Sequence, residues 1–429
     1  MNLLHDLEFR GILKQVTDPT LGDHLETGSI SVYCGFDPTS DSLHVGSLLP
    51  LLTLKRFQLA GHTPIAVSGG ATGMIGDPSG KTAERSLQDN AQIERNLAGV
   101  RATLARFLDL QGPHAAKLVN NADWFQGVTF IDFLRDVGKH FTVNHMMAKE
   151  SVRARLEDRE HGISYTEFSY MLLQAYDFFV LNEKQNCTLQ IGGSDQWGNI
   201  TAGIDLIRKI RASRGEDTVK VFGLTHPLVS KSDGTKFGKT ETGTIWLDPK
   251  KTSPYQFYQF FIQTADADVG TYLRYFTFLS QSEITKLDES VKTEPEKRLA
   301  QSTLAREITK LVHGEEALKQ TELASQALFG TAIQSLDEQT LLDVLSGAPT
   351  LKKDRASITA GLSLVDLLVE TTLCASKGAA RKDLAAGGIY VNNERASDAV
   401  ATIAVANLIA GGYLVLRKGK KNYYLVAFQ

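Results

Sequence analysis

Three polar residues stand at helical spacing in an otherwise apolar segment, T-E-F-S-Y-M-L-L-Q-A-Y-D-F-F-V-L-N at residues 166–182. Tyr170, Gln174 and Asp177 are four and three residues apart, so they share one face of a helix. Such a stripe is usually the solvated side of a helix. Because apolar side chains cover most other directions here, we favour an enclosed polar pocket, where a ligand can supply the partners that buried polar groups need.

Lysines and glycines are concentrated in H-P-L-V-S-K-S-D-G-T-K-F-G-K-T at residues 226–240. Lys231, Lys236 and Lys239 stand among Gly234 and Gly238. A solvated surface turn would explain this composition. The glycines also favour mobility, and a polyanionic ligand would give the lysines something to close upon. We therefore expect a mobile cationic loop.

A glycine-rich segment, G-G-A-T-G-M-I-G-D-P-S-G-K-T, begins at Gly69. The Walker A pattern places four residues between its glycine and G-K-[ST], but Gly76 to Gly80 leaves only three. The spacing from Gly234 to Gly238 fails in the same way. Because a P-loop must close a specific nest around the phosphates, we disfavour a kinase or P-loop ATPase. A glycine-rich turn without a ligand remains the alternative.

A second glycine motif is typical of nucleotide sites. The strand at residues 188–191 runs into Q-I-G-G-S-D-Q-W-G-N-I and a helix that continues to residue 208. The double glycine would admit a sugar closely, and Asp195 could hydrogen-bond ribose hydroxyls. Asp195 could also cap the helix, and the two roles are compatible.

The elements that must position these residues begin with residues 30–47, I-S-V-Y-C-G-F-D-P-T-S-D-S-L-H-V-G-S. Its β-branched start predicts a buried strand, residues 35–42 a turn, and residues 48–60 a helix. Further strands are predicted at residues 64–68, 117–120 and 219–224. In a parallel sheet of this kind, the loop and the first helical turn lie at the carboxyl edge, where free N–H groups and the helix dipole attract phosphate.

Bulk properties limit the class of protein. A chain of 429 residues suggests roughly two to four domains. The formal charge of −3 excludes a uniformly basic nucleic-acid coat, so any RNA contact must be local. The three cysteines have no C-x-x-C spacing, and neither a signal sequence nor a membrane span is evident. We expect a cytoplasmic protein with no membrane partner.

Several blocks resemble a known family. H-V-G-S at residues 44–47 and K-F-G-K-T at residues 236–240 resemble the paired HIGH and KMSKS signatures of class I aminoacyl-tRNA synthetases. Y-C-G-F-D-P-T, G-A-T-G-M-I-G-D-P-S-G-K, E-F-S-Y-M-L-L-Q-A-Y-D and Q-I-G-G-S-D-Q-W-G-N-I look like blocks of the bacterial tyrosyl-tRNA synthetases. The resemblance covers essentially the whole chain, and it is specific because multi-residue blocks recur in order.

The resemblance implies roles for the matching positions. The residues that would bind L-tyrosine are Tyr33, Asp77, Tyr170, Gln174, Asp177 and Gln190. Those that would stabilise the developing pyrophosphate are Thr39, His44, Lys81, Arg85, Lys236 and Lys239. Those that would bind ATP are Gly35, Asp37, Gly46, Ser47, Gly192, Asp195, Gln196 and Lys239. Mg²⁺ would accompany ATP, without a dedicated protein metal site.

Two positions depart from the family pattern. Ser47 stands where HIGH has its second histidine, so a contact of that imidazole to ATP must be remade by a hydroxyl or water, or lost. The second signature keeps both lysines and a hydroxyl. We expect activity to survive, with ATP affinity the parameter affected.

The chain beyond the sheet is predicted to be helical and then α plus β. Residues 121–162 form a helical insertion whose aromatic residues suit either a local core or a subunit interface. From residue 357 onward, eight Lys and Arg residues against five Asp and Glu residues give +3, which suits phosphate-backbone binding. A surface basic cluster is often only solvated. This part resembles the α-L RNA-binding domain that, in the bacterial family, grips the long variable arm of the tRNA.

We predict an α/β protein, with a Rossmann-like doubly wound parallel sheet and helical insertion, a helical domain and an α-L domain. The predicted bounds are 1–225 for the catalytic domain, 226–250 for the signature loop, 251–334 for an anticodon-region helical domain, 335–355 for a linker and 356–429 for the α-L domain. The resemblance implies an ATP-dependent ligase that joins L-tyrosine to tRNA(Tyr) as a homodimer. The alternative is an RNA-binding paralogue that has lost catalysis, although both signature lysines are present.

Overall fold

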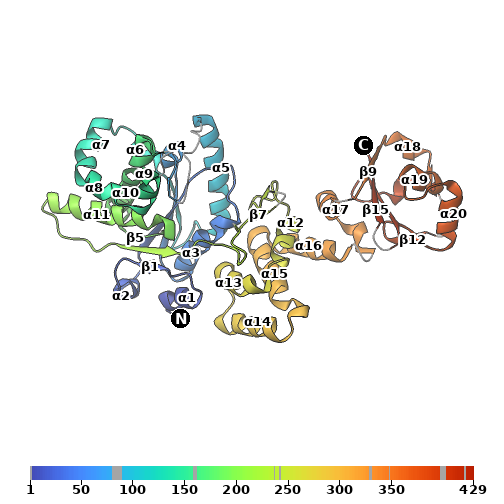
Figure 1. Ribbon diagram of the computed structural model, residues 1–429, viewed down its shortest axis with the longest axis horizontal. Coiled ribbons are helices and arrows are strands. Elements are labelled where there is room, and N and C mark those ends of the chain that lie inside the picture. Colours follow the sequence, from blue (N-terminus) through green and yellow to red (C-terminus); the bar gives the residue numbers. More distant parts are fainter. Residues whose placement is uncertain are drawn as a thin grey trace. The chain divides into compact units, whose positions relative to one another are not determined.

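The computed structural model describes the chain apart from residues 1, 80–88, 158–161, 236, 241–242, 328–330, 347, 397–401 and 420–421 (Figure 1). The chain divides into two compact units. The first contains Met1–Asp248 and Thr264–Leu304, and the second contains Pro249–Gln263 and Ala305–Gln429. Within the described ranges, no helix combines the length and the apolar character needed to cross a membrane.

A six-stranded sheet forms the centre of the first unit, in the order β1-β6-β5-β2-β3-β4. Its strands are β1 (Gln15–Val16), β2 (Ser31–Phe36), β3 (Thr63–Ser68), β4 (Lys117–Asn120), β5 (Cys187–Gly193) and β6 (Phe222–His226). Strands β2 to β6 run parallel, as predicted. Strand β1 departs from the prediction because it pairs antiparallel with β6, so the sheet is mixed. A strand of two residues is too short to show a sequence pattern.

The strand order reverses between β2 and β5, which places a crevice at the carboxyl ends of these two strands. Val32, Ile65 and Leu189 of the central strands are fully buried. Parallel strands covered on both faces are expected to have such continuous burial.

Helices connect these strands. They are α3 (Leu48–Leu59) after β2, α5 (Asn90–Phe107) before β4, α10 (Tyr165–Gln185) before β5 and α11 (Trp197–Ser213) before β6. Helix α10 begins where the Ser164 hydroxyl accepts the backbone N–H of Glu167. It ends at Asn186, which adopts the left-handed conformation common after a helix. The helix that carries the polar stripe is therefore bounded by local sequence signals.

The described part of the insertion at residues 121–162 is helical, as predicted. It contains α6 (Ala122–Phe125), α7 (Phe130–Asp136), α8 (Val143–Met147) and α9 (Glu150–Glu157). Trp124, Phe133 and Phe141 pack against the core around α10, whereas Phe130 is 63% exposed. Some aromatic residues of the insertion therefore belong to the local core, and the role of exposed Phe130 at an interface stays a prediction.

The remaining elements of the first unit surround the sheet. They are α1 (Leu3–Phe9), α2 (Leu21–Glu26), α4 (Thr72–Ile75), α13 (Asp266–Phe276), α14 (Gln281–Thr293), β7 (Lys239–Thr240) and β8 (Gly243–Thr244). Helix α13 is amphipathic, and Val269, Leu273 and Phe276 of one face are completely buried.

The second unit contains helices and a smaller sheet. Its helices are α12 (Pro254–Ile262), α16 (Glu315–Ala327), α17 (Glu338–Val344), α18 (Ala356–Thr359), α19 (Leu364–Glu370), α20 (Lys377–Ala385) and most of α15 (Leu299–His313). Its sheet has the order β12-β11-β14-β15-β9, made of β9 (Thr350–Lys353), β11 (Ile389–Val391), β12 (Glu394–Ala396), β14 (Tyr413–Lys418) and β15 (Asn422–Phe428). Strands β10 (Leu362–Ser363) and β13 (Thr402–Ile403) form a separate pair.

Residues 335–355, which we expected to be a linker, contain α17 and β9. Strand β9 pairs in parallel with β15, and Leu341 and Leu345 are buried. These residues therefore contribute to the folded core of the second unit. Pro349, one of the two residues that suggested a linker, directly precedes β9, and Gly347 lies outside the described residues.

Candidate functional site

A cavity of about 190 Å³ lies at the carboxyl ends of β2 and β5, where the strand order reverses. The two strands, together with β3, α4 and α10, supply much of its wall. Its polar lining residues are Tyr33, Asp37, Thr72, Asp77, Asn121, Tyr170, Gln174, Asp177, Gln190 and Gln196. The polar stripe of α10 faces this cavity, as the pattern of the helix predicts.

Asp177 is a buried carboxyl that two side chains hold in place. Trp124 Nε1 donates to its Oδ1 at 2.8 Å, and Asn121 Nδ2 donates to its Oδ2 at 3.1 Å. Burial raises the pKa of Asp177 to about 7, the two hydrogen bonds oppose the rise, and the nearby Asp37 carboxyl adds to it. Near neutral pH the carboxyl is therefore poised between its two protonation states.

The hydroxyl of Tyr33 and Oε1 of Gln190 are buried polar atoms without a hydrogen-bond partner among the described residues. Burial raises the pKa of Tyr33 well above its usual value, and the Asp177 carboxyl adds to the shift. The Tyr33 hydroxyl therefore stays protonated. Buried polar groups are nearly always paired, so these atoms suit a ligand that brings a hydroxyl group into the cavity.

A chain of hydrogen bonds crosses the cavity from Asp177 to Asp37. Asn121 Nδ2 also donates to Thr72 Oγ1 at 3.0 Å, and Thr72 Oγ1 donates to Asp37 Oδ1 at 2.9 Å. The Tyr170 hydroxyl donates to Asp37 Oδ2 at 3.1 Å. Gly69 is needed here because an added Cβ would collide with the Asp37 carboxylate and the Thr72 hydroxyl. The carboxylates on both sides of the cavity are thus held by one network.

A second network gathers acceptors near the start of α11. Gln196 Nε2 donates to Asp77 Oδ2 at 2.6 Å, and Ser79 N donates to Asp77 Oδ1 at 2.9 Å. Asn199 Nδ2 donates to Gln174 Oε1 at 3.0 Å. Carboxylate and amide oxygens that line a cavity suit a cationic ligand group such as an ammonium.

The first signature, residues 44–47, lies directly before α3. His44 Nδ1 accepts the backbone N–H of Gly46 at 2.9 Å, which fixes the imidazole. A Cβ on Gly46 would lie 2.6 Å from the His44 ring, so glycine permits this close approach. The backbone of Val45 donates to Ile245 O at 3.0 Å, which joins this signature to the chain after the second one.

The structure brings ten predicted residues together in the cavity lining. They are Tyr33, Gly35, Asp37, Asp77, Tyr170, Gln174, Asp177, Gln190, Gly192 and Gln196. Five others, Thr39, His44, Gly46, Ser47 and Asp195, are not part of that lining. Lys81, Arg85 and Lys236 lie outside the described residues, and for Lys239 only the backbone, in β7, is described.

Sequence reasoning missed Thr72, Asn121, Trp124 and Asn199, which orient the predicted residues. Asn121 had a usable signal, since it directly follows a predicted strand, where parallel sheets place ligand-binding groups. Trp124 had none, because one tryptophan among the aromatic residues of the insertion looks like packing.

The described residues contain no group of three or more His, Cys, Asp or Glu side chains that could hold a metal ion. The hydrogen-bond donors and acceptors that line the cavity suit the recognition of a polar ligand.

The sequence is similar to those of known proteins along its whole length. The family described as tRNA synthetases class I (W and Y) matches residues 25–330, and the C-terminal domain of SYY-like tyrosine–tRNA ligases matches residues 341–426. The tyrosine–tRNA ligase of Bacillus velezensis is 54% identical over 429 residues, which is 100% of each chain. That of Roseiflexus castenholzii is 53% identical over 426 residues, or 99% of each chain.

A solved structure agrees with these sequence matches. The C-terminally truncated mitochondrial tyrosyl-tRNA synthetase of Aspergillus nidulans is 32% identical with a TM-score of 0.68, over 76% of this chain and 94% of that one. The chain belongs to the family of class I tRNA synthetases of the tryptophan and tyrosine type.

Proposed function

We propose that this chain is a tyrosine–tRNA ligase. It activates L-tyrosine with ATP and then transfers tyrosine to the 3′ terminal adenosine of tRNA(Tyr). The observation that carries the proposal is the pair formed by the unpartnered Tyr33 hydroxyl and the Asp177 carboxyl in a buried cavity. A phenol hydroxyl is both donor and acceptor, so it can satisfy both groups at once.

Recognition of the rest of tyrosine uses the acceptors on the opposite network. Asp77, Tyr170 and Gln174 bind the ammonium group through their oxygen atoms, and Gln190 completes the pocket. Gln196 and Asn199 already hold Asp77 and Gln174 in place. These side chains therefore lose little conformational entropy when the ligand binds.

In the activation step, a carboxylate oxygen of tyrosine attacks the α-phosphorus of ATP. The bond to the β-phosphate oxygen breaks, and pyrophosphate leaves with the electron pair. Thr39 and His44, together with the cationic residues Lys81, Arg85, Lys236 and Lys239, stabilise the charge that develops on the pyrophosphate. No side-chain nucleophile is required, since positioning and electrostatic stabilisation are sufficient.

ATP binds along the glycine-rich edge of the sheet. The residues that we assign to its binding are Gly35, Asp37, Gly46, Ser47, Gly192, Asp195, Gln196 and Lys239. A Cβ at Gly192 would lie 3.2 Å from the Gln196 side chain, so glycine lets Gln196 pack closely against the end of β5. Mg²⁺ enters with the ATP phosphates as part of the substrate.

In the transfer step, a ribose hydroxyl of the tRNA attacks the carbonyl carbon of the adenylate and AMP leaves. We assign tRNA binding in part to the α-L type domain at residues 356–429. Its basic side chains include Arg417, whose guanidinium lies 3.8 Å from the centre of the Tyr390 ring. The stacked pair offers phosphate a charge and bases a flat surface. The helices between residues 251 and 334 are assigned to the anticodon region.

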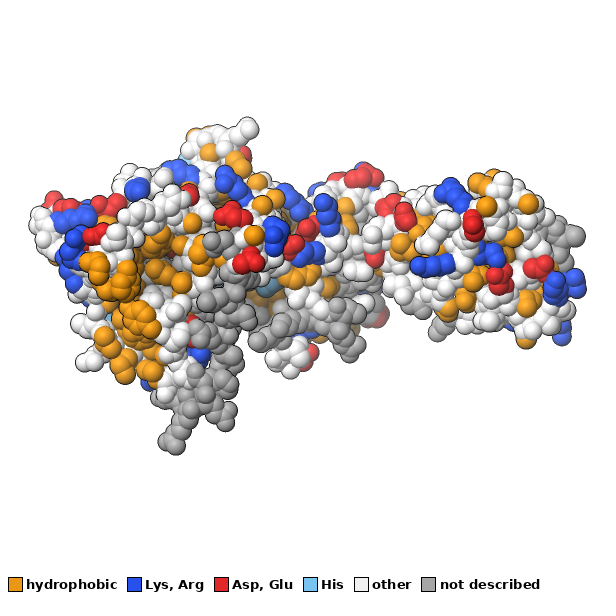
Figure 2. Space-filling model, turned by 90° about the horizontal axis from the view of Figure 1, so that it is seen from above, with side chains coloured by type: hydrophobic (Ala, Val, Ile, Leu, Met, Phe, Trp, Pro, Cys, Tyr) orange, Lys and Arg blue, Asp and Glu red, His pale blue; other side chains and the backbone are white. Residues whose placement is uncertain are grey.

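We assign the helical insertion to a homodimer interface. Its exposed large apolar residues among those described are Phe130, Ile131, Leu134, Val143, Met147 and Leu156. Hydrophobic side chains gather on part of the face drawn in Figure 2, at the end where α7 and α8 lie in Figure 1. An apolar patch of this kind marks an interaction site.

The cysteines are free and buried, which supports a reducing compartment, and we assign the protein to the cytoplasm.

Charging of tRNA tests the proposal. Purified full-length chain with ATP, Mg²⁺ and labelled tyrosine should attach tyrosine to a bacterial tRNA(Tyr) transcript, and should leave a tRNA of another identity uncharged. The competing hypothesis, an inactive RNA-binding paralogue, predicts binding of tRNA(Tyr) without charging. That result would contradict the proposed function.

A further inference from the structure

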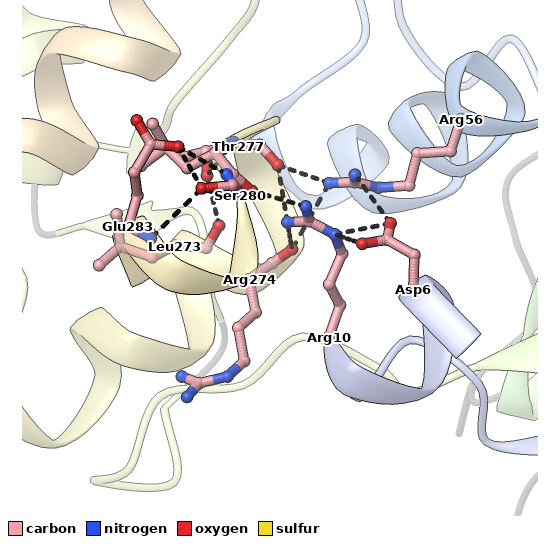
Figure 3. Close-up of polar contacts among 9 residues, drawn as sticks. Asp6, Arg10, Arg56, Leu273, Arg274, Thr277, Ser280 and Glu283 are labelled. Carbon is pink, nitrogen blue, oxygen red and sulfur yellow. Dashed lines mark hydrogen bonds and ion pairs between the residues drawn. The ribbon is translucent and has the colours of Figure 1, made fainter. Parts of the chain in front are cut away.

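Two buried arginines hold the C-terminal end of α13. Arg10, just after α1, and Arg56, in the last turn of α3, are 4% and 5% exposed. Arg10 Nη1 donates to the carbonyl oxygens of Arg274 at 3.2 Å and Thr277 at 3.1 Å, and its Nη2 donates to Leu279 O at 2.7 Å. Figure 3 shows both guanidinium groups directed at the same end of the helix.

Arg56 binds the same carbonyl groups from another element. Its Nη2 donates to Thr277 O at 2.6 Å and to Arg274 O at 3.5 Å. Asp6 supplies the counter-charge, since it accepts Arg10 Nε at 2.8 Å and lies 3.6 Å from Arg56 Nη1. We call Asp6, Arg10 and Arg56 the arginine clamp.

Elementary physics explains why the clamp is specific. The last carbonyl groups of a helix lack partners within the helix and carry partial negative charge, so cations are favoured there. Burial lowers the pKa of Arg56 to about 9, with Arg10 adding to the shift and Asp6 opposing it, so Arg56 is still a cation at neutral pH. Two buried cations are costly unless they are paired and hydrogen-bonded, so the contacts to Asp6 and to the helix carbonyl groups restrict where the two guanidinium groups can lie. Arg56 Nε is an exception, since it has no hydrogen-bond partner among the described residues.

Helix α13 also contacts part of the signature loop, at Ser230, Ser232 and Phe237. Asp268 Oδ1 accepts the backbone N–H of Ser232 at 2.9 Å, and the Tyr272 hydroxyl donates to Ser230 O at 3.0 Å. The ring of Phe237 lies 4.8 Å from that of Tyr272 and 5.3 Å from that of Phe276. The segment just before Lys239 therefore rests on α13.

Helix α3 links the clamp to the first signature. Its N-terminal end directly follows Ser47, and Arg56 lies near its other end. At the signatures themselves, Gly238 packs so closely that an added Cβ would collide with Val45. Helix α3 thus holds the first signature at its N-terminal end, and helix α13 holds the second signature through its contacts with the loop.

We propose that Arg10 and Arg56 are positioning residues for tyrosine activation, which set the place of the signature loop relative to His44. The inference rests on the proposed function, in which Lys239 and His44 act on the same pyrophosphate. A lost clamp shifts α13 and its loop but leaves the cavity around Asp177 untouched. The loss must therefore appear in ATP-dependent kinetics and not in tyrosine binding.

The experiment compares Arg56→Met and Arg56→Lys in the full-length chain by tyrosine-dependent exchange of pyrophosphate into ATP. Arg56→Met should reduce kcat/KM for ATP by about tenfold to a hundredfold, because small misplacements of catalytic groups have effects of this size. The Kd for tyrosine, from equilibrium dialysis without ATP, should stay within about twofold. Arg56→Lys keeps one donor and the charge, so it should show a smaller loss of the same kind.

Arg155→Met is the matched control for a merely structural role. Arg155 forms an ion pair with Glu167 at 2.9 Å, and both side chains are as buried as the two arginines of the clamp. Its removal should lower thermal stability without the selective loss in kcat/KM for ATP. Wild-type ATP kinetics in folded Arg56→Met, or in Arg56→Lys if Arg56→Met does not fold, would overturn the inference. An equal loss in tyrosine binding would do the same.

Amide hydrogen exchange separates this inference from the proposed function. Exchange at residues 230–235 and 237–240 should be faster in Arg56→Met than in the wild type, whether or not the chain is active. If the wild-type chain has no activity but exchange in the loop is still faster in Arg56→Met, the proposed function is refuted and the role of the clamp in positioning the loop is supported. Unchanged exchange in the loop would refute the clamp.

Discussion

The proposed tyrosine side and the proposed nucleotide side of the site are built in opposite ways. The tyrosine side consists of buried polar groups: Asp177 is held by hydrogen bonds from Asn121 and Trp124, and the Tyr33 hydroxyl has no hydrogen-bond partner among the described residues. The nucleotide side consists of turns and glycine-rich segments, in which Thr39 is exposed and His44 and Ser47 are half-buried.

The difference reflects what each ligand requires. A site distinguishes a neutral phenol from an unsubstituted phenyl ring through buried polar groups, because these groups lose their hydrogen-bond partner when the hydroxyl is missing. A triphosphate needs positive charge that stabilises the transition state, and flexible cations can provide it. The two halves should therefore respond to mutation separately, one in tyrosine affinity and the other in turnover.

The largest effect is expected from Lys239→Ala, which removes a cation from the nucleotide side. Loss of one group that stabilises developing charge lowers kcat by about 10²–10³-fold. Pre-steady-state formation of tyrosyl-adenylate measures this directly, and the Kd for tyrosine should not change. Lys231→Ala, in the same loop, is the control and should be far less affected. Equal effects of the two substitutions would remove the specific role of Lys239.

Asp177→Ala should produce the next largest effect, on the tyrosine side. Removal of a buried acceptor leaves the phenol and the Tyr33 hydroxyl poorly paired, so tyrosine should bind about a hundredfold more weakly. Equilibrium dialysis gives the Kd. Asp343→Ala removes a buried carboxyl from the second unit and should leave the Kd unchanged. Normal tyrosine binding by folded Asp177→Ala would show that the α10 stripe has been misread.

The pH dependence of stability follows from the same carboxyl. The folded chain holds the Asp177 proton up to a pKa of about 7, whereas the unfolded chain releases it near pH 4, so stability is lost as pH rises between these values. From pH 5 to pH 8 this group should cost about 3 kcal/mol in the unliganded chain.

Asp177→Asn should remove that part of the pH dependence. Urea unfolding followed by tryptophan fluorescence is a suitable measurement, because Trp124, Trp197 and Trp246 all belong to the first unit. Identical pH profiles for the variant and the wild type would contradict the raised pKa.

The smallest effect is expected from Ser47→His, which restores the second histidine of the first signature. One added hydrogen bond to ATP should lower the KM for ATP by about threefold and leave the KM for tyrosine unchanged. Steady-state exchange kinetics provide both values. A change in the KM for tyrosine alone would contradict the assignment of residue 47 to ATP binding.

Sequence alone predicted most of the first unit because strong local patterns determine it. The parallel strands and the polar stripe of α10 both follow from periodicity. Strand β1 was missed because it is two residues long. The α17 and β9 segment was missed because its glycine and proline resemble a linker, whereas pairing with β15 is a long-range interaction.

The site was predicted in the same uneven way. Residues that belong to recognisable blocks, such as Tyr33 and Gln190, do meet in one cavity. The side chains that orient the predicted residues come from distant segments, as Trp124 does for Asp177, and no sequence spacing relates the two. Contacts of this kind depend on the folded sheet, and a local pattern does not contain them.

The most direct test of the two-sided site compares tyrosine with phenylalanine as the amino acid in pyrophosphate exchange. Phenylalanine would leave both Tyr33 and Asp177 without a partner, so kcat/KM for tyrosine should exceed that for phenylalanine by about a thousandfold. The KM for ATP should be similar with either amino acid. Equal kcat/KM values, or no exchange with tyrosine at millimolar substrates, would contradict the account.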